Sequence, residues 1–192
     1  HMAPKVLAFA ASLRAASWNR KLVHVAADGA KAAGAEVTIL DLKQYPVPVY
    51  DGDLEAAEGL PGNVHKLKDL FKAHDGFLIS SPEYNAGFPG MLKNLTDWLS
   101  RPREGEKPFE IFAGKPVAAM AASPGAIGGV RMLASLRAHL LHLQMLVIPQ
   151  TYGLGKAAEA FDESGALKDP KIDGTVKALG ARVAELAARL KS

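Results

Sequence analysis

Four side chains that can donate hydrogen bonds follow a short apolar run near the start of the chain. Ser12, Arg14, Ser17 and Asn19 lie in the stretch FAASLRAASWNRKL, between a predicted strand and the pattern of a helix. A helix N-terminus presents unpaired N–H groups and the positive end of the helix dipole, and both favour an anion. An arginine can also bind a phosphate through two N–H groups. The stretch therefore predicts a monophosphate site, although Ser17 could serve only as a helix cap.

Two other phosphate motifs are missing from this stretch. The sequence has no GxxxxGK[ST], so triphosphate chemistry with magnesium is not expected. Ala10 and Ala11 stand where a dinucleotide-binding GxGxxG loop would need glycines. The remaining interpretation is a cradle for a single phosphate group.

A second polar turn follows an apolar run in SSPEYNAGFPGMLKNLTDWLSR, residues 80–101. Pro82 is expected to end a strand, and Tyr84 and Asn85 suit a turn. Pro89 suits the first turn of a helix. Free backbone N–H groups here, with a tyrosine beside them, could hold the polar edge of a flat heterocycle. The alternative is a plain strand–turn–helix connection.

A third loop, AASPGAIGGVR, covers residues 121–131. Ser123, Gly125 and Gly128 follow another apolar run, and glycines let a backbone come close to a ligand. We expect this loop to form the second wall of a ring pocket, opposite residues 82–85. A flexible strand-to-helix turn is the alternative.

Apolar runs and amphipathic stretches alternate along the chain, and the stretches have the i, i+3/i+4, i+7 spacing of helices. This alternation predicts an α/β fold with helices on both faces of a parallel sheet. We expect a flavodoxin-like three-layer sandwich with a five-stranded parallel sheet in the order 2-1-3-4-5, or else the order 3-2-1-4-5. The predicted strands are Val6–Ala10, Glu36–Leu40, Gly76–Ser80, Pro116–Ala121 and Met145–Pro149, and the predicted helices are Trp18–Gly34, Gly62–Ala73, Pro89–Arg101, Gly128–Gln144 and Lys171–Lys191.

Residues 3–192 are predicted to form a single domain, because the length suits one core. His1–Met2 resembles a remnant of an expression vector. Two segments, 43–61 and 152–170, are long for loops, and they are either functional or plain surface connections.

Composition excludes several classes of protein. The chain has 192 residues, no cysteine and a net charge of +3. A chain without cysteine has no disulfide framework and no thiolate metal site, which fits a reducing cytoplasm. No apolar run is long enough to span a membrane, and the basic residues alternate with acids, so neither a membrane nor nucleic acid is expected. His139 and His142 lack a third ligand in register, so no metal is expected.

Three strings together resemble the NADPH-dependent FMN reductase family, which includes bacterial quinone, chromate and azo-dye reductases. They are SLRAASWN, SPEYNAGFPGMLKNLTDWLSR and SPGAIGGVRMLASLRAHLLHL, in this order, and the resemblance runs from about Val6 to Pro149. It implies a flavodoxin-like fold and non-covalently bound FMN, with NADPH or NADH as co-substrate. It also implies a homodimer or homotetramer.

The resemblance assigns roles to individual residues. It implies that Ser12, Arg14, Ser17 and Asn19 hold the FMN phosphate, that Pro82, Glu83, Tyr84 and Asn85 line one side of the isoalloxazine, and that Ser123, Gly125 and Gly128 close the other side. The helix of residues 89–101, with Lys93, Asn94, Asp97, Trp98 and Arg101, resembles the family's dimer face. Ala11 departs from the family, which commonly has glycine there. No catalytic side chain is implied, because the flavin carries the chemistry.

The reaction implied by the resemblance is a ping-pong cycle. Hydride passes from NAD(P)H to bound FMN, and an acceptor such as a quinone, free flavin, chromate or an azo compound is then reduced. The alternative is a non-enzymatic electron carrier of the flavodoxin type. Such carriers are commonly acidic, whereas this chain has a pI of about 9.1 and an arginine, Arg14, in its phosphate loop, which favours the enzyme.

Overall fold

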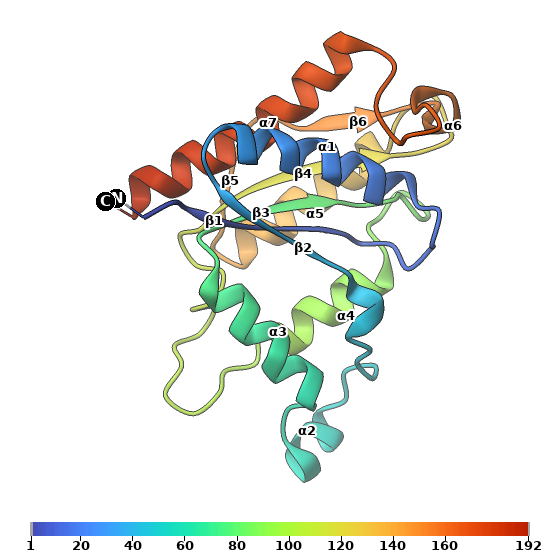
Figure 1. The fold of residues 1–192 in the computed structure, drawn as a ribbon. Helices are drawn as coiled ribbons and strands as arrows, with labels where there is room; N and C mark the ends of the chain where they lie inside the picture. The colour runs from blue at the N-terminus through green and yellow to red at the C-terminus, as the bar shows by residue number, and fades with distance from the viewer. Residues whose placement is uncertain (1, 192) are drawn as a thin grey trace.

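Within residues 2–191, which the computed structural model describes, six strands form one parallel sheet (Figure 1). His1 of the predicted vector remnant and Ser192 at the end of the predicted domain lie outside the described residues. The strands are β1 (Lys5–Ala10), β2 (Glu36–Leu40), β3 (Gly76–Ser80), β4 (Pro116–Ala122), β5 (Leu146–Val147) and β6 (Tyr152–Leu154).

The strand order β2-β1-β3-β4-β5 confirms the first of the two predicted orders. The sixth strand was not expected. The predicted strand Met145–Pro149 is reduced to two residues, because Pro149 has no N–H with which to continue the ladder. The chain then returns at Tyr152 and pairs with β4 farther along, opposite Met120. Two short strands therefore share the place predicted for one.

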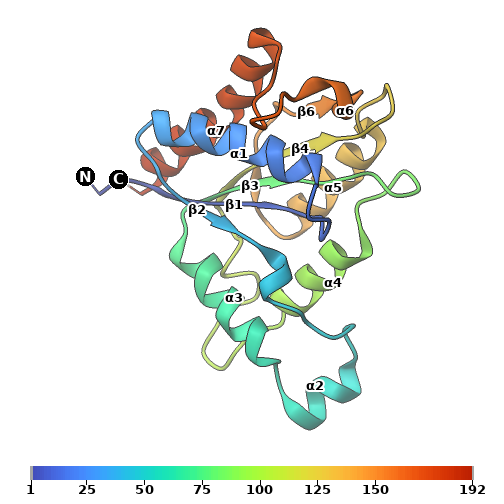
Figure 2. The same ribbon diagram turned by 45° about the vertical axis from the view of Figure 1, so that its right-hand side comes forward.

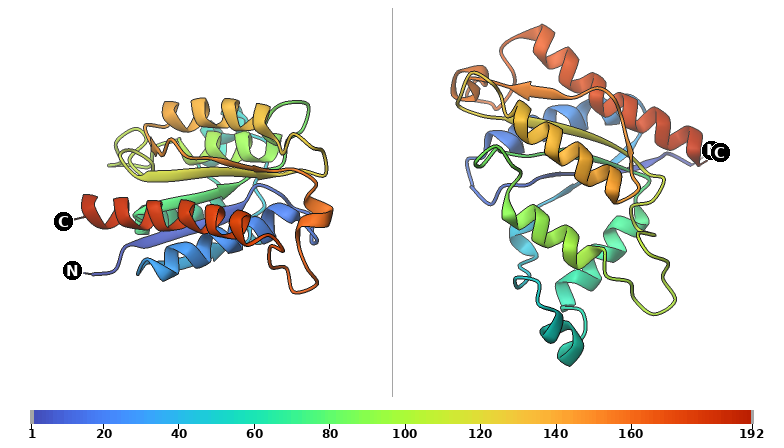
Figure 3. Two further views of the ribbon diagram at one scale, coloured as in Figure 1. Left: turned by 90° about the horizontal axis from the view of Figure 1, so that it is seen from above. Right: turned by 180° about the vertical axis from the view of Figure 1, so that it is seen from behind.

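Two layers of helices cover the sheet (Figures 1 and 3). On one face lie α1 (Trp18–Ala32) and α7 (Pro170–Leu190), and on the other lie α3 (Gly62–Ala73), α4 (Gly90–Leu99) and α5 (Val130–His142). The five predicted helices are therefore all present, with small differences at their ends.

The alternation of side chains along each strand supplies both cores. In β1, Val6 and Ala8 pack under α1 and α7, whereas Leu7 and Phe9 pack under α3 and its neighbours. A strand covered on both faces must be apolar at every position, which explains the continuous apolar runs in the sequence. The strands at the two sides of the sheet are less buried: only the last residue is buried in β2 (Leu40) and β6 (Leu154), and none in β5.

The two segments predicted to be long loops contain secondary structure. Residues 43–61 include α2 (Gly52–Glu58), which has no buried residue and stands away from the sheet (Figure 2). The 3-10 helix η1 (Leu42–Gln44) precedes it. Residues 152–170 begin with β6 and contain α6 (Ala157–Ala160).

Helices α1 and α7 cross in close contact at two glycines. A Cβ atom on Gly29 would overlap the carbonyl oxygen of Lys177, and one on Gly180 would overlap the carbonyl oxygen of Ala26. No side chain larger than hydrogen fits at either position unless the helices separate. The glycines therefore set the distance between these helices on this face of the sheet.

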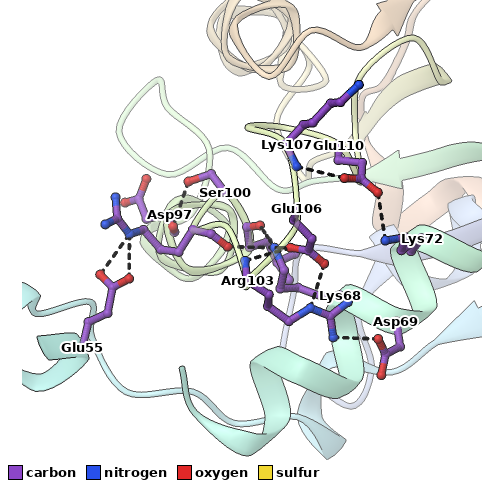
Figure 4. Close-up of polar contacts among 12 residues, drawn as sticks. Glu55, Lys68, Asp69, Lys72, Asp97, Ser100, Arg103, Glu106, Lys107 and Glu110 are labelled. Carbon is purple, nitrogen blue, oxygen red and sulfur yellow. Dashed lines mark hydrogen bonds and ion pairs between the residues drawn. The ribbon is translucent and has the colours of Figure 1, made fainter. Parts of the chain in front are cut away.

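A buried polar network ties α3 to the segment that follows α4 (Figure 4). The Lys68 side chain is 3% exposed, and its Nζ lies 2.9 Å from a carboxylate oxygen of Glu106. Lys68 Nζ also donates to the carbonyl oxygens of Leu99 (3.0 Å) and Arg101 (2.8 Å) at the end of α4. Arg103 completes the network by pairing with Glu106.

The glycine contact gives a first prediction. Gly180→Ala should lower the free energy of unfolding by about 3 kcal/mol, because the added methyl group forces the helices apart. Gly174→Ala is the matched control on the same helix, since a Cβ there meets no atom within 4 Å. The control should raise stability by about 0.5–1 kcal/mol. Urea denaturation followed by circular dichroism measures both, and equal effects of the two variants would contradict the assignment.

The network gives a second prediction. Burial alone would raise the pKa of Glu106, but the Arg103 backbone N–H, Lys68 and the Arg103 side chain lower it from 4.5 to about 2. A lowered folded-state pKa stabilises the protein above pH 4.5, and this contribution is lost as the pH falls toward 2. The loss should reach up to about 3 kcal/mol.

Glu106→Gln should flatten this part of the stability profile and should lower stability at pH 7, because Lys68 loses its partner. Glu104→Gln, at an exposed position two residues away, is the control and should leave the profile unchanged. The measurement is the urea midpoint at several pH values. A Glu106→Gln variant with the parent's slope between pH 4.5 and 2 would rule out this carboxylate as the source.

Candidate functional site

A cavity of about 250 Å³ lies at the carboxyl edge of the sheet, where the segments after β1, β3 and β4 meet. These segments are far apart in the sequence, and the sheet order brings them together. All of the predicted site residues line this cavity except Asn85, Gly125 and Gly128. The lining residues are Ser12, Arg14, Ser17, Trp18, Asn19, Pro82, Glu83, Tyr84, Ala122, Ser123 and Pro124.

The segment after β1 combines helix capping with an open positive charge. Ser17 is the N-cap of α1, and its hydroxyl accepts the N–H of Arg20, so the capping role considered from the sequence is real. Arg14 is exposed, and its guanidinium carbon lies 5.5 Å from the centre of the Trp18 ring, a cation–π contact. Within the described residues Arg14 forms no ion pair. Its charge is therefore available for an anion.

Asn19 is only 3% exposed, and most of its amide is already engaged. Its Oδ1 accepts hydrogen bonds from the Ala122 backbone N–H and the Ser80 hydroxyl, both at 2.8 Å. Its Nδ2 donates to the Ala122 carbonyl oxygen at 3.0 Å. The prediction treated all four donors alike, but Asn19 mainly joins α1 to the ends of β3 and β4.

The predicted turn in the segment after β3 is a tight hairpin. Tyr84 and Gly87 exchange two backbone hydrogen bonds of 2.9 and 3.0 Å. Asn85 (φ 52°) and Ala86 (φ 62°) between them are left-handed, as in a type I′ turn. Asparagine tolerates this conformation, whereas alanine is strained there. The turn is exposed and extends beyond the end of β3 (Figure 2).

Glu83 points toward α5. Its carboxylate accepts hydrogen bonds from the Arg131 side chain (2.6 and 3.0 Å) and the Met132 backbone N–H (3.1 Å). The Met132 N–H lowers the pKa of Glu83, burial opposes this shift, and Arg131 adds to it. This carboxylate ties the segment after β3 to the start of α5, and Glu83 also lines the cavity, so its contact with a ring stays a prediction.

Gly128, in the segment after β4, lets two pieces of backbone touch. A Cβ on Gly128 would lie 2.5 Å from the Gly153 carbonyl oxygen, and one on Gly153 would lie 2.6 Å from the Gly128 carbonyl oxygen. The φ of Gly128 is also positive, at 67°. Gly128 was expected to approach a ligand, but it packs against β6, a strand that the sequence pattern did not reveal.

Several residues predicted as a dimer face also hold the segment 43–61 within the chain. Trp98 is fully buried, and its Nε1 donates to the Pro48 carbonyl oxygen at 2.8 Å. The Asn94 side chain accepts the Tyr50 backbone N–H at 2.7 Å and donates to Pro48 at 2.8 Å. Arg101 pairs with Glu55 of α2. Of the five residues named, Lys93, Asp97 and Arg101 keep side chains that are partly exposed to solvent.

Trp18, Ala122 and Pro124 line the cavity and were not predicted. No usable sequence signal marked Trp18, because Arg14 precedes the N-cap Ser17 and helical i, i+4 spacing does not apply to this pair. Ala122 is the last residue of β4, and no sequence pattern marked it as a cavity residue.

The two histidines considered as metal ligands have separate partners. The Nε2 of His139 lies 2.8 Å from the Thr96 hydroxyl, and its ring is 5.0 Å from that of Phe88. Burial lowers the pKa of His139. His142 instead packs edge-on against Phe109. Within residues 2–191 no group of three or more His, Cys, Asp or Glu side chains could hold a metal ion.

Comparison with models of protein families matches residues 4–159 to the family described as NADPH-dependent FMN reductase. The chain belongs to this family. A flavoenzyme NAD(P)H:(acceptor) oxidoreductase from Paracoccus denitrificans has the same fold, with a TM-score of 0.79 and 30% identity over 97% of this chain and 98% of that one. Family membership makes the protein an enzyme, with FMN as its cofactor and NAD(P)H as the electron donor.

Curated reductases are similar over most of the chain. An NAD(P)H-dependent FMN reductase of Pseudomonas aeruginosa is 36% identical over 169 residues, covering 87% of this chain and 86% of that protein. A quinone reductase of Escherichia coli is 37% identical over 152 residues, covering 79% of this chain and 77% of that protein. The first name agrees with the family, and the second names a quinone as the acceptor of that relative.

Proposed function

We propose that this FMN reductase binds FMN at the cavity on the carboxyl edge of the sheet and reduces quinones with electrons from NAD(P)H. The observation that carries the proposal is the meeting of the three predicted segments around one cavity. The donor set fits a phosphate ester, because the Ser12 hydroxyl and the Arg14 guanidinium lie beside the N-terminus of α1.

The residues of this chain bind and orient, and none of them needs to exchange protons with a substrate. Bound FMN supplies the redox chemistry, accepting hydride from NAD(P)H and reducing an acceptor. In our proposal Arg14, Ser12 and Ser17 hold the phosphate, and Pro82, Tyr84 and Asn85 face Ser123 and Gly125 across the ring. Backbone N–H groups of these turns would stabilise negative charge on the reduced ring.

Quinones are the acceptors that we propose first, because a curated relative is named a quinone reductase. Free flavin, chromate and azo compounds remain predictions from the resemblance. Donor and acceptor must meet the same flavin, so we propose a ping-pong cycle. The flavodoxin-type carrier has less support, since the relatives similar over most of the chain are named as reductases.

We also propose a homodimer or homotetramer. Ile127 (62% exposed) and Val130 (49% exposed) form an open apolar surface beside the cavity. With Leu133 and Arg137 they line a groove of about 520 Å³. Because Trp98 and Asn94 are used inside the chain, this surface supplements residues 89–101 as the place where a second copy would pack.

The location of the protein is still a prediction from composition. Across residues 2–191, every helix is too short or too polar to cross a bilayer. The absence of cysteine fits a reducing cytoplasm, and we propose that compartment.

The third prediction tests the function directly. The purified protein should show the absorption of bound FMN, and it should oxidise NADPH or NADH when benzoquinone is added. Initial rates at several concentrations of both substrates should give parallel double-reciprocal lines, as a ping-pong cycle requires. An FMN-loaded preparation that turns over with neither nicotinamide would contradict the proposal and favour the electron carrier.

The fourth prediction concerns the phosphate. Arg14→Ala should weaken FMN binding about tenfold or more, because a charged hydrogen-bond donor is lost. Riboflavin, which lacks the phosphate, should bind almost as before. Arg182→Ala, at an exposed position on α7 that pairs with Glu185, is the matched control and should change neither affinity. Fluorescence titration measures both ligands, and equal losses for FMN and riboflavin would refute the phosphate contact.

A further inference from the structure

The amide of Asn19 occupies a place in the sheet that a strand would otherwise fill. In a parallel ladder, the N–H and C=O of alternate residues bond to the same neighbouring strand. Met120 of β4 bonds toward β3, since its carbonyl oxygen accepts the Ser81 N–H at 2.9 Å. Ala122, two residues on, therefore also directs its N–H and C=O toward the β3 side.

Strand β3 has ended by that level. Its pairing with β4 stops at Ser80 opposite Met120, and Ser81 makes the last backbone bond from this segment to β4, to the Met120 carbonyl oxygen. Two backbone groups of Ala122 would be left without a partner at the edge of the site, and such groups are costly when buried. The Asn19 amide accepts from one (2.8 Å) and donates to the other (3.0 Å).

The Asn19 amide uses most of its hydrogen-bonding capacity inside the protein. Its oxygen has two lone pairs, and both are used, by the Ala122 N–H and the Ser80 hydroxyl. One of its two N–H bonds is used by the Ala122 carbonyl. If the amide were reversed, its Nδ2 would face the Ala122 N–H and its Oδ1 would face the Ala122 carbonyl oxygen. Neither pair could form a hydrogen bond, so the network allows one orientation only.

Asn19 and its two partners stand at the three segments that form the cavity. Asn19 itself stands two residues after the cap residue Ser17, in the first turn of α1. Ser80 is the last residue of β3 and precedes Pro82, while Ala122 ends β4 and precedes Ser123. A shift of this one amide would change the separation of all three walls.

We propose that Asn19 is a positioning residue, which sets the spacing of the three segments so that both the ring end and the phosphate end of the flavin fit. This inference rests on the proposed binding of FMN at the cavity. It differs from the role given by the resemblance, in which Asn19 acts on the phosphate alone. The two roles predict different losses for ligands with and without a phosphate.

The fifth prediction uses two variants and two ligands. Asn19→Ala should weaken FMN and riboflavin by a similar factor of about ten or more, since the whole cavity is disturbed. Ser80→Ala is the sharper variant, because Ser80 is 0% exposed and cannot touch a ligand. It should weaken both flavins by a common factor of about three to ten.

Thr96→Val is the matched control for loss of a buried hydroxyl. Thr96 is 6% exposed and bonds to His139 and the Lys93 carbonyl, away from the cavity. It should lower the melting temperature but leave both flavin affinities unchanged. The affinities are measured by fluorescence titration of folded protein, with circular dichroism to show the folded fraction.

Two results would overturn the inference. Loss of FMN binding by Asn19→Ala with riboflavin binding intact would make Asn19 a phosphate ligand. Unchanged affinities in Ser80→Ala would show that the network does not set the cavity, and this variant decides the question even if Asn19→Ala does not fold. Failure of the parent protein to bind either flavin would instead refute the proposed function.

Discussion

Backbone groups at the ends of parallel strands must find hydrogen-bond partners when the strands separate, and that requirement organises the edge of the sheet at which the cavity lies. β3 ends before β4, which leaves the N–H and C=O of Ala122 to the amide of Asn19. On its other side, β4 continues with β6, so that Ser123 donates to the Leu154 carbonyl oxygen. The segments after β3 and β4, which surround the cavity, therefore begin where the hydrogen bonds between these strands end.

Several residues at or near the cavity also stabilise its walls. Glu83 ties the turn after β3 to α5, and Ser17 caps α1. Gly128 lets the segment after β4 touch β6. Such residues are as necessary for an FMN reductase as the phosphate ligands, because a loop contributes binding energy only when it is already in place.

The buried ion pairs and the exposed residues near the cavity lie in different parts of the molecule. Buried ion pairs around Lys68 and Glu106 fasten α3 to the segment after α4. The strained turn at Ala86 and the apolar residues Ile127 and Val130 lie instead on the surface near the cavity. The proposed ping-pong cycle would need such an accessible face, because two substrates would meet the flavin in turn.

The sequence by itself determined the order of the elements and the edge at which the polar segments meet. Apolar periodicity and turn chemistry are local properties, so the strands around Val6–Ala10 and Gly76–Ser80 and the turn at Asn85 could be read from neighbours in the chain. The resemblance to the FMN reductase family could also be found without a structure, because each of its three strings is an unbroken run of residues.

Only the tertiary structure decided which polar side chains remain free for a ligand. The amide of Asn19 is engaged by Ala122, 103 residues away, and the carboxylate of Glu83 by Arg131, 48 residues away. Strand β6 likewise exists only because β4 offers it an edge. Hydrogen bonds between distant residues depend on how the sheet and helices pack, and local sequence patterns carry no record of that packing.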